Sequence, residues 1–189
     1  MLNNNLTPTK TLQLIFKKIK PKSHFLDLGF GQGKDVLFMA KNKFNVTAVE
    51  KSESLVKQIK EDIKKDNLNN IKVTQSNALD FKIEKNKYDI INCNNVLPFL
   101  KKDKALGLIK NIQKKIKKNG FILLSAFTTD DPSYKSKDKF LTYFKPQEIL
   151  KLFNDFKIIY YLENVILDNG HLSDPEPHKH GVVKIIVQN

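Results

Sequence analysis

Hydrophobic positions along the chain alternate between two periodicities. Short, mostly apolar runs, which are typical of buried strands, are separated by longer segments in which apolar residues recur every three to four positions, as in amphipathic helices. The predicted strands cover residues 23–28, 44–50, 71–75, 88–93, 121–127, 156–163 and 182–187. This alternation predicts an α/β fold with a mostly parallel sheet, because helices supply the crossovers that parallel strands need.

The helix signals agree with this pattern. Thr7-Pro8 places an N-cap residue before a proline at the first helical position, and Pro21 ends that helix. Ser52 is the predicted N-cap of a later helix. Further helices are predicted through Val36 to Ala40, Leu55 to Ile63, Ala105 to Ile116 and Pro146 to Asn154. A length of 189 residues suits one domain with its own core.

A glycine-rich segment follows the first predicted strand. Glycines at positions 29, 31 and 33 allow a sharp turn and a close approach of the backbone to a ligand, and the next helix presents free N–H groups. A dinucleotide fingerprint needs G-x-G-x-x-G, whereas here the third glycine comes one position early and Lys34 occupies its place. The segment therefore predicts a nucleotide-cofactor loop of another type.

Two acidic residues indicate which cofactor this loop holds. Asp27 precedes the loop, and Glu50 ends the second predicted strand. A carboxylate at the end of that strand can accept hydrogen bonds from both ribose hydroxyls. Asp27 can lie near the cationic end of a methionine moiety. The pair favours S-adenosylmethionine over a dinucleotide.

Together with the closing segment 174–183, DPEPHKHGVV, the segment 27–35, DLGFGQGKD, resembles the tellurite-resistance (TehB-like) family of class I S-adenosylmethionine-dependent methyltransferases. The resemblance implies a single domain over residues 1–189 with a Rossmann-like methyltransferase fold. Its sheet would have seven mostly parallel strands and a C-terminal antiparallel hairpin. Residues 1–20 would form a helix that covers the cofactor side. S-adenosyl-L-homocysteine would be the product left by the cofactor.

The cofactor contacts are expected at the carboxyl ends of the parallel strands, where ligands bind in open α/β sheets. Asn77 stands where the class I methyltransferase superfamily usually has an acidic residue that contacts the adenine amino group, and its side-chain oxygen can accept the same hydrogen bond. Asn94 can hold the methionine end or the acceptor, although a turn asparagine facing solvent explains it as well. The predicted contacts are Asp27, Gly29, Phe30, Gly31, Gly33, Glu50, Lys51, Asn77, Ala78 and Asn94.

Three of the four histidines, His171, His178 and His180, fall between the last two predicted strands. We expect this segment to be a loop over the mouth of the active site, so these histidines are the candidate catalytic residues. An imidazole can remove a proton from an acidic nucleophile or, when charged, attract an anion. A proline-bearing surface loop is the alternative. The histidines with a carboxylate also match a tetrahedral metal site, but methyl transfer requires no metal and none is expected.

Composition limits the partners. The net charge of +13 comes with thirty-three lysines and no arginine. Because phosphate and base-edge recognition favours the arginine fork, the lysines are interpreted as solvated helix faces, and no nucleic-acid partner is expected. The single cysteine, Cys93, lies in an apolar strand and is interpreted as a buried thiol in a reducing compartment. The chain has neither a signal-peptide pattern nor an apolar run of the ~20 residues that a membrane span needs, so a cytoplasmic protein is expected.

The expected function is methyl transfer to a small, soft nucleophile, by resemblance an oxyanion of tellurium or selenium, or a thiol. The protein would act as a monomer or homodimer. The sequence departs from the family at one point, because His171 is followed by Leu172 where the family has an arginine. Two alternatives stay open: an RNA methyltransferase that uses the lysine excess, and a non-catalytic S-adenosylmethionine-binding protein.

Overall fold

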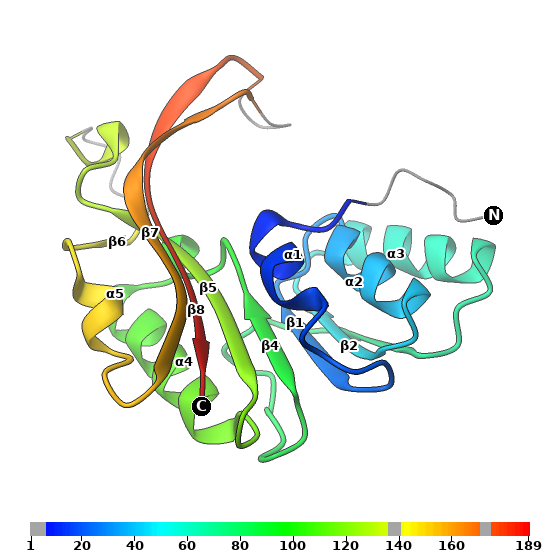
Figure 1. The fold of residues 1–189 in the computed structure, drawn as a ribbon. Coiled ribbons are helices and arrows are strands. Elements are labelled where there is room, and N and C mark those ends of the chain that lie inside the picture. The colour runs from blue at the N-terminus through cyan, green and yellow to red at the C-terminus, as the bar shows by residue number, and fades with distance from the viewer. Residues whose placement is uncertain (1–6, 136–140, 171–174) are drawn as a thin grey trace.

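An eight-stranded sheet organises the computed structural model, which describes residues 7–135, 141–170 and 175–189 (Figure 1). Its main path runs β3-β2-β1-β4-β5-β8-β7, and a short β6 pairs with β5. The strands are β1 His24–Leu28, β2 Asn45–Glu50, β3 Ile71–Gln75, β4 Ile90–Cys93, β5 Phe121–Thr128, β6 Tyr143–Phe144, β7 Lys157–Asp168 and β8 His178–Gln188. Strands β1 to β6 pair in parallel, whereas β8 is antiparallel to both β5 and β7. The predicted mostly parallel sheet with its C-terminal antiparallel hairpin is confirmed, and β6 brings the number of strands to eight where seven were expected.

Helices cover both faces of this sheet (Figure 1). They are α1 Lys10–Phe16, α2 Lys34–Lys41, α3 Glu53–Lys65, α4 Lys102–Lys115 and α5 Glu148–Lys151, with short 3-10 helices η1 Leu97–Phe99 and η2 Pro132–Lys135. Buried residues of α1, α2 and α3 pack in one cluster, and those of α4 and α5 pack in the other. Among the residues that the structure describes, no helix is both long and apolar enough to cross a membrane.

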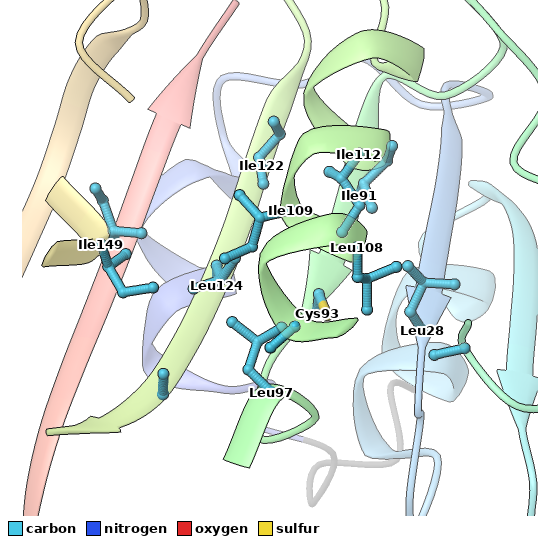
Figure 2. Close-up of a cluster of buried hydrophobic side chains, with 14 of the residues drawn as sticks. Leu28, Ile91, Cys93, Leu97, Leu108, Ile109, Ile112, Ile122, Leu124 and Ile149 are labelled. Atoms are coloured by element: carbon cyan, nitrogen blue, oxygen red, sulfur yellow. The ribbon is translucent and has the colours of Figure 1, made fainter. Parts of the chain in front are cut away.

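Alternating side chains of the central strands divide the core between the two faces. Phe25 and Leu123 belong to the cluster beneath α1, α2 and α3, whereas their chain neighbours Leu26 and Leu124 belong to the cluster beneath α4 and α5. Figure 2 shows the second cluster, where Leu108, Ile109 and Ile112 of α4 lie over β4 and β5. Both faces are apolar because the sheet is buried on both sides, which is typical of parallel sheets.

The C-terminal hairpin is longer than the sequence pattern predicted. Strand β7 continues to Asp168 and β8 begins at His178, so the predicted loop around His178 and His180 is wrong for these two residues. Their backbones pair with Asp168 and Ile166 of β7. The pattern gave no strand signal here because the segment is polar, but cross-strand hydrogen bonds satisfy the backbone regardless of side-chain polarity.

Both bounds of the first helix also differ from the prediction. Helix α1 begins at Lys10, with Thr9 rather than Thr7 at the N-cap position, and it ends at Phe16 rather than just before Pro21. The Thr9 backbone N–H and hydroxyl both donate to the Asp35 carboxylate, each at 2.8 Å. Thr9 therefore ties α1 to the first turn of α2 instead of capping its own helix. Towards the C-terminus, α5 covers only Glu148–Lys151 of the helix predicted through Pro146 to Asn154.

Candidate functional site

A cavity of about 510 Å³ opens at the carboxyl ends of the parallel strands. Its size falls within the ~300–1,000 Å³ of typical small-ligand sites. It is lined by Thr9, Asp27, Gly29, Phe30, Gly31, Gln32, Lys34, Asp35, Glu50, Lys51, Asn77, Ala78, Asn92, Asn94, Asn95, Val96, Phe99 and Leu100. All of the predicted cofactor contacts except Gly33 are among these described residues. The structure thus brings them to one place, while their role in binding a cofactor stays a prediction.

The glycine loop forms one wall of the cavity. Gly29 and Gly31 both have positive φ, at 73° and 54°, a conformation that glycine adopts without the strain of a side chain. A Cβ on Gly29 would lie 2.5 Å from Val96 Cγ2, whereas a Cβ on Gly31 would meet no atom within 4 Å. The turn therefore requires glycine at 29 for close packing, and at 31 it leaves bare backbone beside the cavity.

Asp27 is the most strongly perturbed acid in the cavity. Burial raises the pKa of its carboxyl well above the usual range, and the nearby carboxylates of Asp35 and Glu50 raise it further. A hydrogen bond of 2.9 Å from Asn92 Nδ2 to Asp27 Oδ1 opposes this effect by favouring the charged form. Three acids close to a single cavity favour a ligand that carries positive charge.

A short network continues from Asp27 along the end of β4. Asn94 Nδ2 donates to Asn92 Oδ1 at 2.7 Å and to Thr11 Oγ1 of α1 at 3.2 Å. The other end of this amide, Asn94 Oδ1, is buried and has no hydrogen-bond partner within the described part of the chain. A buried acceptor without a partner costs about 1–3 kcal/mol, so this oxygen is suited to receive a donor from a ligand.

Glu50 and Asp35 are held by backbone donors. Glu50 accepts hydrogen bonds from the backbone N–H groups of Gly31 at 3.1 Å, Lys51 at 2.9 Å and Ser52 at 3.0 Å. These bonds fix its carboxylate beside the glycine loop. Burial raises the pKa of Asp35, while the two hydrogen bonds from Thr9 act against that shift. Both acids are therefore oriented before any ligand binds.

The predicted contacts Asn77, Ala78 and Gly33 lie just after β3 and at the start of α2. Asn77 and Ala78 line the cavity after β3, and Asn77 Oδ1 already accepts the Leu79 N–H at 3.0 Å. A carbonyl oxygen has two lone pairs, so it can still accept a second bond. Gly33 lies at the N-cap of α2 with φ 73°, where a Cβ would come within 2.2 Å of Ile59 Cδ1. Its position suits helix packing.

Sequence reasoning missed several residues that line the cavity. Asn92 is the clearest, because it is an amide within the apolar strand Ile90–Cys93 and is nearly fully buried. A buried polar residue in an apolar run signals a specific partner. Thr9 and Asp35 carried no comparable signal. At the rim, Phe99 is 62% exposed beside Val96 and Leu100, which gives the cavity an apolar edge.

The described histidines of the predicted catalytic set do not line this cavity. His178 and His180 lie on β8, where His180 Nδ1 is 3.0 Å from Asp131 Oδ2 and its ring stacks on Phe127. His171 lies outside the described residues. His178 and His180 are thus not among the lining residues, and their catalytic role stays a prediction.

Cys93 agrees with its interpretation as a buried thiol. It lies in the core cluster beneath α4, as Figure 2 shows, and is fully buried. Burial, together with the nearby Asp27 carboxylate, raises the pKa of the thiol to about 12. A thiol that stays protonated is a poor nucleophile, so Cys93 is suited to packing rather than to chemistry.

The donor and acceptor set fits S-adenosylmethionine. The cationic methionine end matches the acidic surroundings of Asp27 and the Asn94 oxygen that lacks a partner. The ribose hydroxyls match Glu50 at the end of β2, and the adenine matches the segment of Asn77 and Ala78. Bare backbone at Gly31 permits close approach of the ligand.

Comparisons with known proteins agree with the fold and with the family that the sequence resembles. The family model described as "Tellurite resistance protein TehB" matches residues 3–178. A probable S-adenosyl-L-methionine-dependent methyltransferase TehB of Haemophilus influenzae is 29% identical over 150 residues, which are 78% of this chain and 51% of the relative. The chain therefore spans about half the length of this curated relative.

Solved structures show the same architecture. The crystal structure of TehB from Haemophilus influenzae matches with a TM-score of 0.84 at 23% identity, covering 99% of this chain and 64% of that one. Coclaurine N-methyltransferase bound to N-methylheliamine and SAH matches with a TM-score of 0.72 at 16% identity, covering 95% of this chain and 72% of that one. At these identities the likeness establishes the fold.

Proposed function

The chain belongs to the TehB family of class I S-adenosylmethionine-dependent methyltransferases, and we propose that it transfers the methyl group of this cofactor to a small, soft nucleophile. The observation that carries the proposal is the clustering of the cofactor contacts, predicted from sequence, around one cavity at the carboxyl ends of the strands. We further propose that residues 1–189 act as one methyltransferase domain.

In this proposal, the polar groups at the ends of β1, β2 and β4 have defined tasks. Asp27, oriented by Asn92, balances the positive charge of the methionine end. Asn94 Oδ1 accepts a hydrogen bond from the ammonium group, which gives that buried oxygen its missing partner. Glu50 accepts from the ribose hydroxyls. Because these groups are held by hydrogen bonds within the protein, little reorganisation accompanies binding.

When bound, the cofactor supplies an electrophilic methyl group on a sulfonium. The protein contributes mainly alignment, since holding two reactants in line replaces a bimolecular encounter with an effectively unimolecular step. Val96, Phe99 and Leu100 form an apolar edge beside the cavity. This edge excludes water from the path by which an acceptor approaches.

The size and chemistry of the cavity support a small acceptor. A nucleoside with a methionine arm would fill most of about 510 Å³, and the residual space suits an oxyanion or a thiol better than a polymer. The description of the matching family, "Tellurite resistance protein TehB", points to tellurium oxyanions as the first acceptors to test. The chain has no arginine to bind an oxyanion, so a thiol belongs in the same test.

The catalytic assignment of the histidines is kept as a separate proposal. His178 and His180 would act on the acceptor only if the acceptor reached the β7–β8 hairpin, because their rings contact Asp131, Phe127 and each other rather than the cavity. Replacing each of His171, His178 and His180 with alanine and measuring turnover at saturating cofactor tests the assignment. Unchanged turnover in all three variants would show that it is wrong.

The experiment that tests the function is methyl transfer from labelled S-adenosylmethionine. The protein is incubated in parallel with tellurite, selenite, a set of small thiols and bulk RNA. Label in a small product is the expected result. Label retained in RNA would replace the proposal by an RNA methyltransferase, and tight cofactor binding without transfer to any acceptor would indicate a non-catalytic binding protein.

A further inference from the structure

A second cluster of chemically reactive groups lies at the tip of the β7–β8 hairpin. Asp168 of β7 and His178 of β8 are direct partners in the antiparallel register, and His180 lies two residues further along β8 on the same face. One ligand atom from each of the three residues lies within 4.8 Å of the others. The cluster is therefore built by strand pairing, independently of the cofactor cavity.

The hairpin extends past the end of the main sheet, as Figure 1 shows, and the cluster lies near its far end, where β7 ends at Asp168 and β8 begins at His178. Val182 is the first β8 residue that pairs with β5, opposite Phe127. His178 precedes it by about 13 Å at ~3.3 Å per residue. All three side chains are half-buried, so an ion from solvent can reach them.

The imidazole rings of His178 and His180 approach each other through their Nε2 atoms. His178 Nε2 and His180 Nε2 are 2.9 Å apart. Each Nδ1 is engaged by an oxygen acceptor: Glu176 O at 2.7 Å for His178 and Asp131 Oδ2 at 3.0 Å for His180. In neutral rings that donate through Nδ1, both Nε2 atoms direct lone pairs at one another, which is repulsive unless a proton or a cation lies between them.

The contacts of the two Nδ1 atoms match those of metal-binding histidines, which usually donate the N–H of the ring nitrogen that is not bonded to the metal to a carboxylate or a backbone carbonyl. Both types of acceptor occur here. The Asp131 side chain, 1% exposed, also accepts the backbone N–H of Gly181 at 3.0 Å and that of Ser133 at 2.8 Å. The carboxylate that orients His180 is thus fixed in place.

Two further contacts hold His180 in this orientation. Its ring stacks on Phe127 with centroids 4.8 Å apart and an angle of 12° between the planes. A Cβ on Gly181 would lie 2.2 Å from the Asp131 backbone nitrogen, so glycine is what lets the Asp131 segment approach β8. On the other strand, Asp168 Oδ1 accepts the Gly170 N–H at 2.9 Å, which orients that carboxylate.

We propose that Asp168, His178 and His180 form a binding site for one divalent cation of the zinc class. Two imidazole nitrogens and one carboxylate oxygen are ligands that Zn²⁺ takes, with solvent in the fourth position. Zn–N bonds of about 2.0–2.1 Å in a tetrahedron separate two ligand nitrogens by about 3.3 Å. The observed 2.9 Å therefore needs to open by only a few tenths of an ångström.

The ion would connect three segments of the chain. Asp168 belongs to β7, the histidines belong to β8, and Asp131 extends the link to the segment that follows β5. A Nε2 atom bonded to a metal cannot also accept a proton. The metal site and the catalytic role of His178 and His180 are therefore competing assignments.

The test is titration of chelator-stripped, tag-free protein with Zn²⁺ by calorimetry, followed by Co²⁺ for its visible absorption. One equivalent of Zn²⁺ and absorption bands typical of four-coordinate Co²⁺ are expected. His178→Ala, His180→Ala and the isosteric Asp168→Asn should each weaken Zn²⁺ binding at least 10-fold. Asp131→Asn, which removes the carboxylate behind His180, should weaken it by about 10–100-fold.

His24→Ala is the matched control, because His24 begins β1 far from the hairpin and should leave Zn²⁺ binding unchanged. Binding of S-adenosylmethionine serves as the folding control for each variant. Absence of Zn²⁺ binding by the intact protein would overturn the proposal. So would a folded Asp168→Asn protein that binds Zn²⁺ as tightly as the parent does.

Discussion

Asn92 donates a hydrogen bond of 2.9 Å to the buried carboxylate of Asp27, its direct partner in the β1–β4 register. The two residues are 65 positions apart in sequence. The bond favours the charged form of an acid whose pKa is raised by burial and by the neighbouring Asp35. It therefore opposes the loss of negative charge at the point where the cavity is best suited to a cation.

Replacing Asn92 with alanine should weaken cofactor binding and destabilise the protein. Asp27 would lose its charge-favouring donor, so its pKa would rise further. A buried acceptor that loses its partner costs about 1–3 kcal/mol. Thermal unfolding and calorimetric titration with S-adenosylmethionine measure the two effects. Asn45→Ala serves for comparison, since Asn45 is exposed at the start of β2, donates to Lys22 O and does not line the cavity.

Asp27→Asn should separate stability from binding. The amide keeps the size of the side chain and an oxygen that can accept from Asn92 but cannot ionise, so the ligand-free protein should gain about 1 kcal/mol or a few degrees in Tm once the pH exceeds the raised pKa of Asp27. Cofactor affinity should fall at least about 10-fold, because the cationic methionine end loses its counter-charge. If the variant binds the cofactor as tightly as the parent, Asp27 does not contact that end.

The pH dependence follows from the same raised pKa values. Folded Asp27 and Asp35 hold protons more tightly than the unfolded chain does, so their contribution to stability is present below about pH 4 and is lost as pH rises through the folded pKa values. Cofactor binding has the opposite dependence, because a cation prefers the ionised acid. Affinity should thus fall as pH is lowered through the raised pKa of Asp27. Calorimetry across this range should give a flatter profile for Asp27→Asn.

Glu50→Gln should reduce cofactor affinity by about 10-fold or more. The carboxylate accepts from the Gly31 and Lys51 backbone N–H groups through different oxygens, and an amide would turn an NH₂ group towards one of these donors. Glu53→Gln is a suitable control, because Glu53 is exposed on α3 three residues away. Equal affinities for the two variants would exclude Glu50 from the cofactor site.

Phe99→Ala should alter the acceptor without altering the fold. The ring is 62% exposed at the rim of the cavity, so its removal leaves the core intact and the Tm nearly unchanged. We expect a several-fold higher KM for the acceptor with an unchanged Kd for S-adenosylmethionine. Steady-state kinetics with the active acceptor provide the measurement. Should KM stay constant while cofactor binding weakens, Phe99 would belong to the cofactor rather than to the acceptor.

Much of this architecture follows from local sequence. The strands up to β5 are encoded by apolar runs or, for β3, by alternating apolar and polar residues, and the turn after β1 is encoded by glycines whose positive φ other residues rarely adopt. Because ligands bind at the carboxyl ends of parallel strands, the same pattern placed Asp27, Glu50 and Asn77 around one cavity. Local conformation and strand order were enough for that inference.

Only the tertiary structure decided which distant polar groups meet. Sheet register sets Asn92 against Asp27, and pairing along an extended hairpin sets Asp168 against His178. The approach of Asp131 to His180, 49 residues away, depends on the small volume of Gly181. The sequence gives no local signal for these contacts. It shows which strand residues are polar, but the partner of each polar side chain is determined by how the strands and loops pack together.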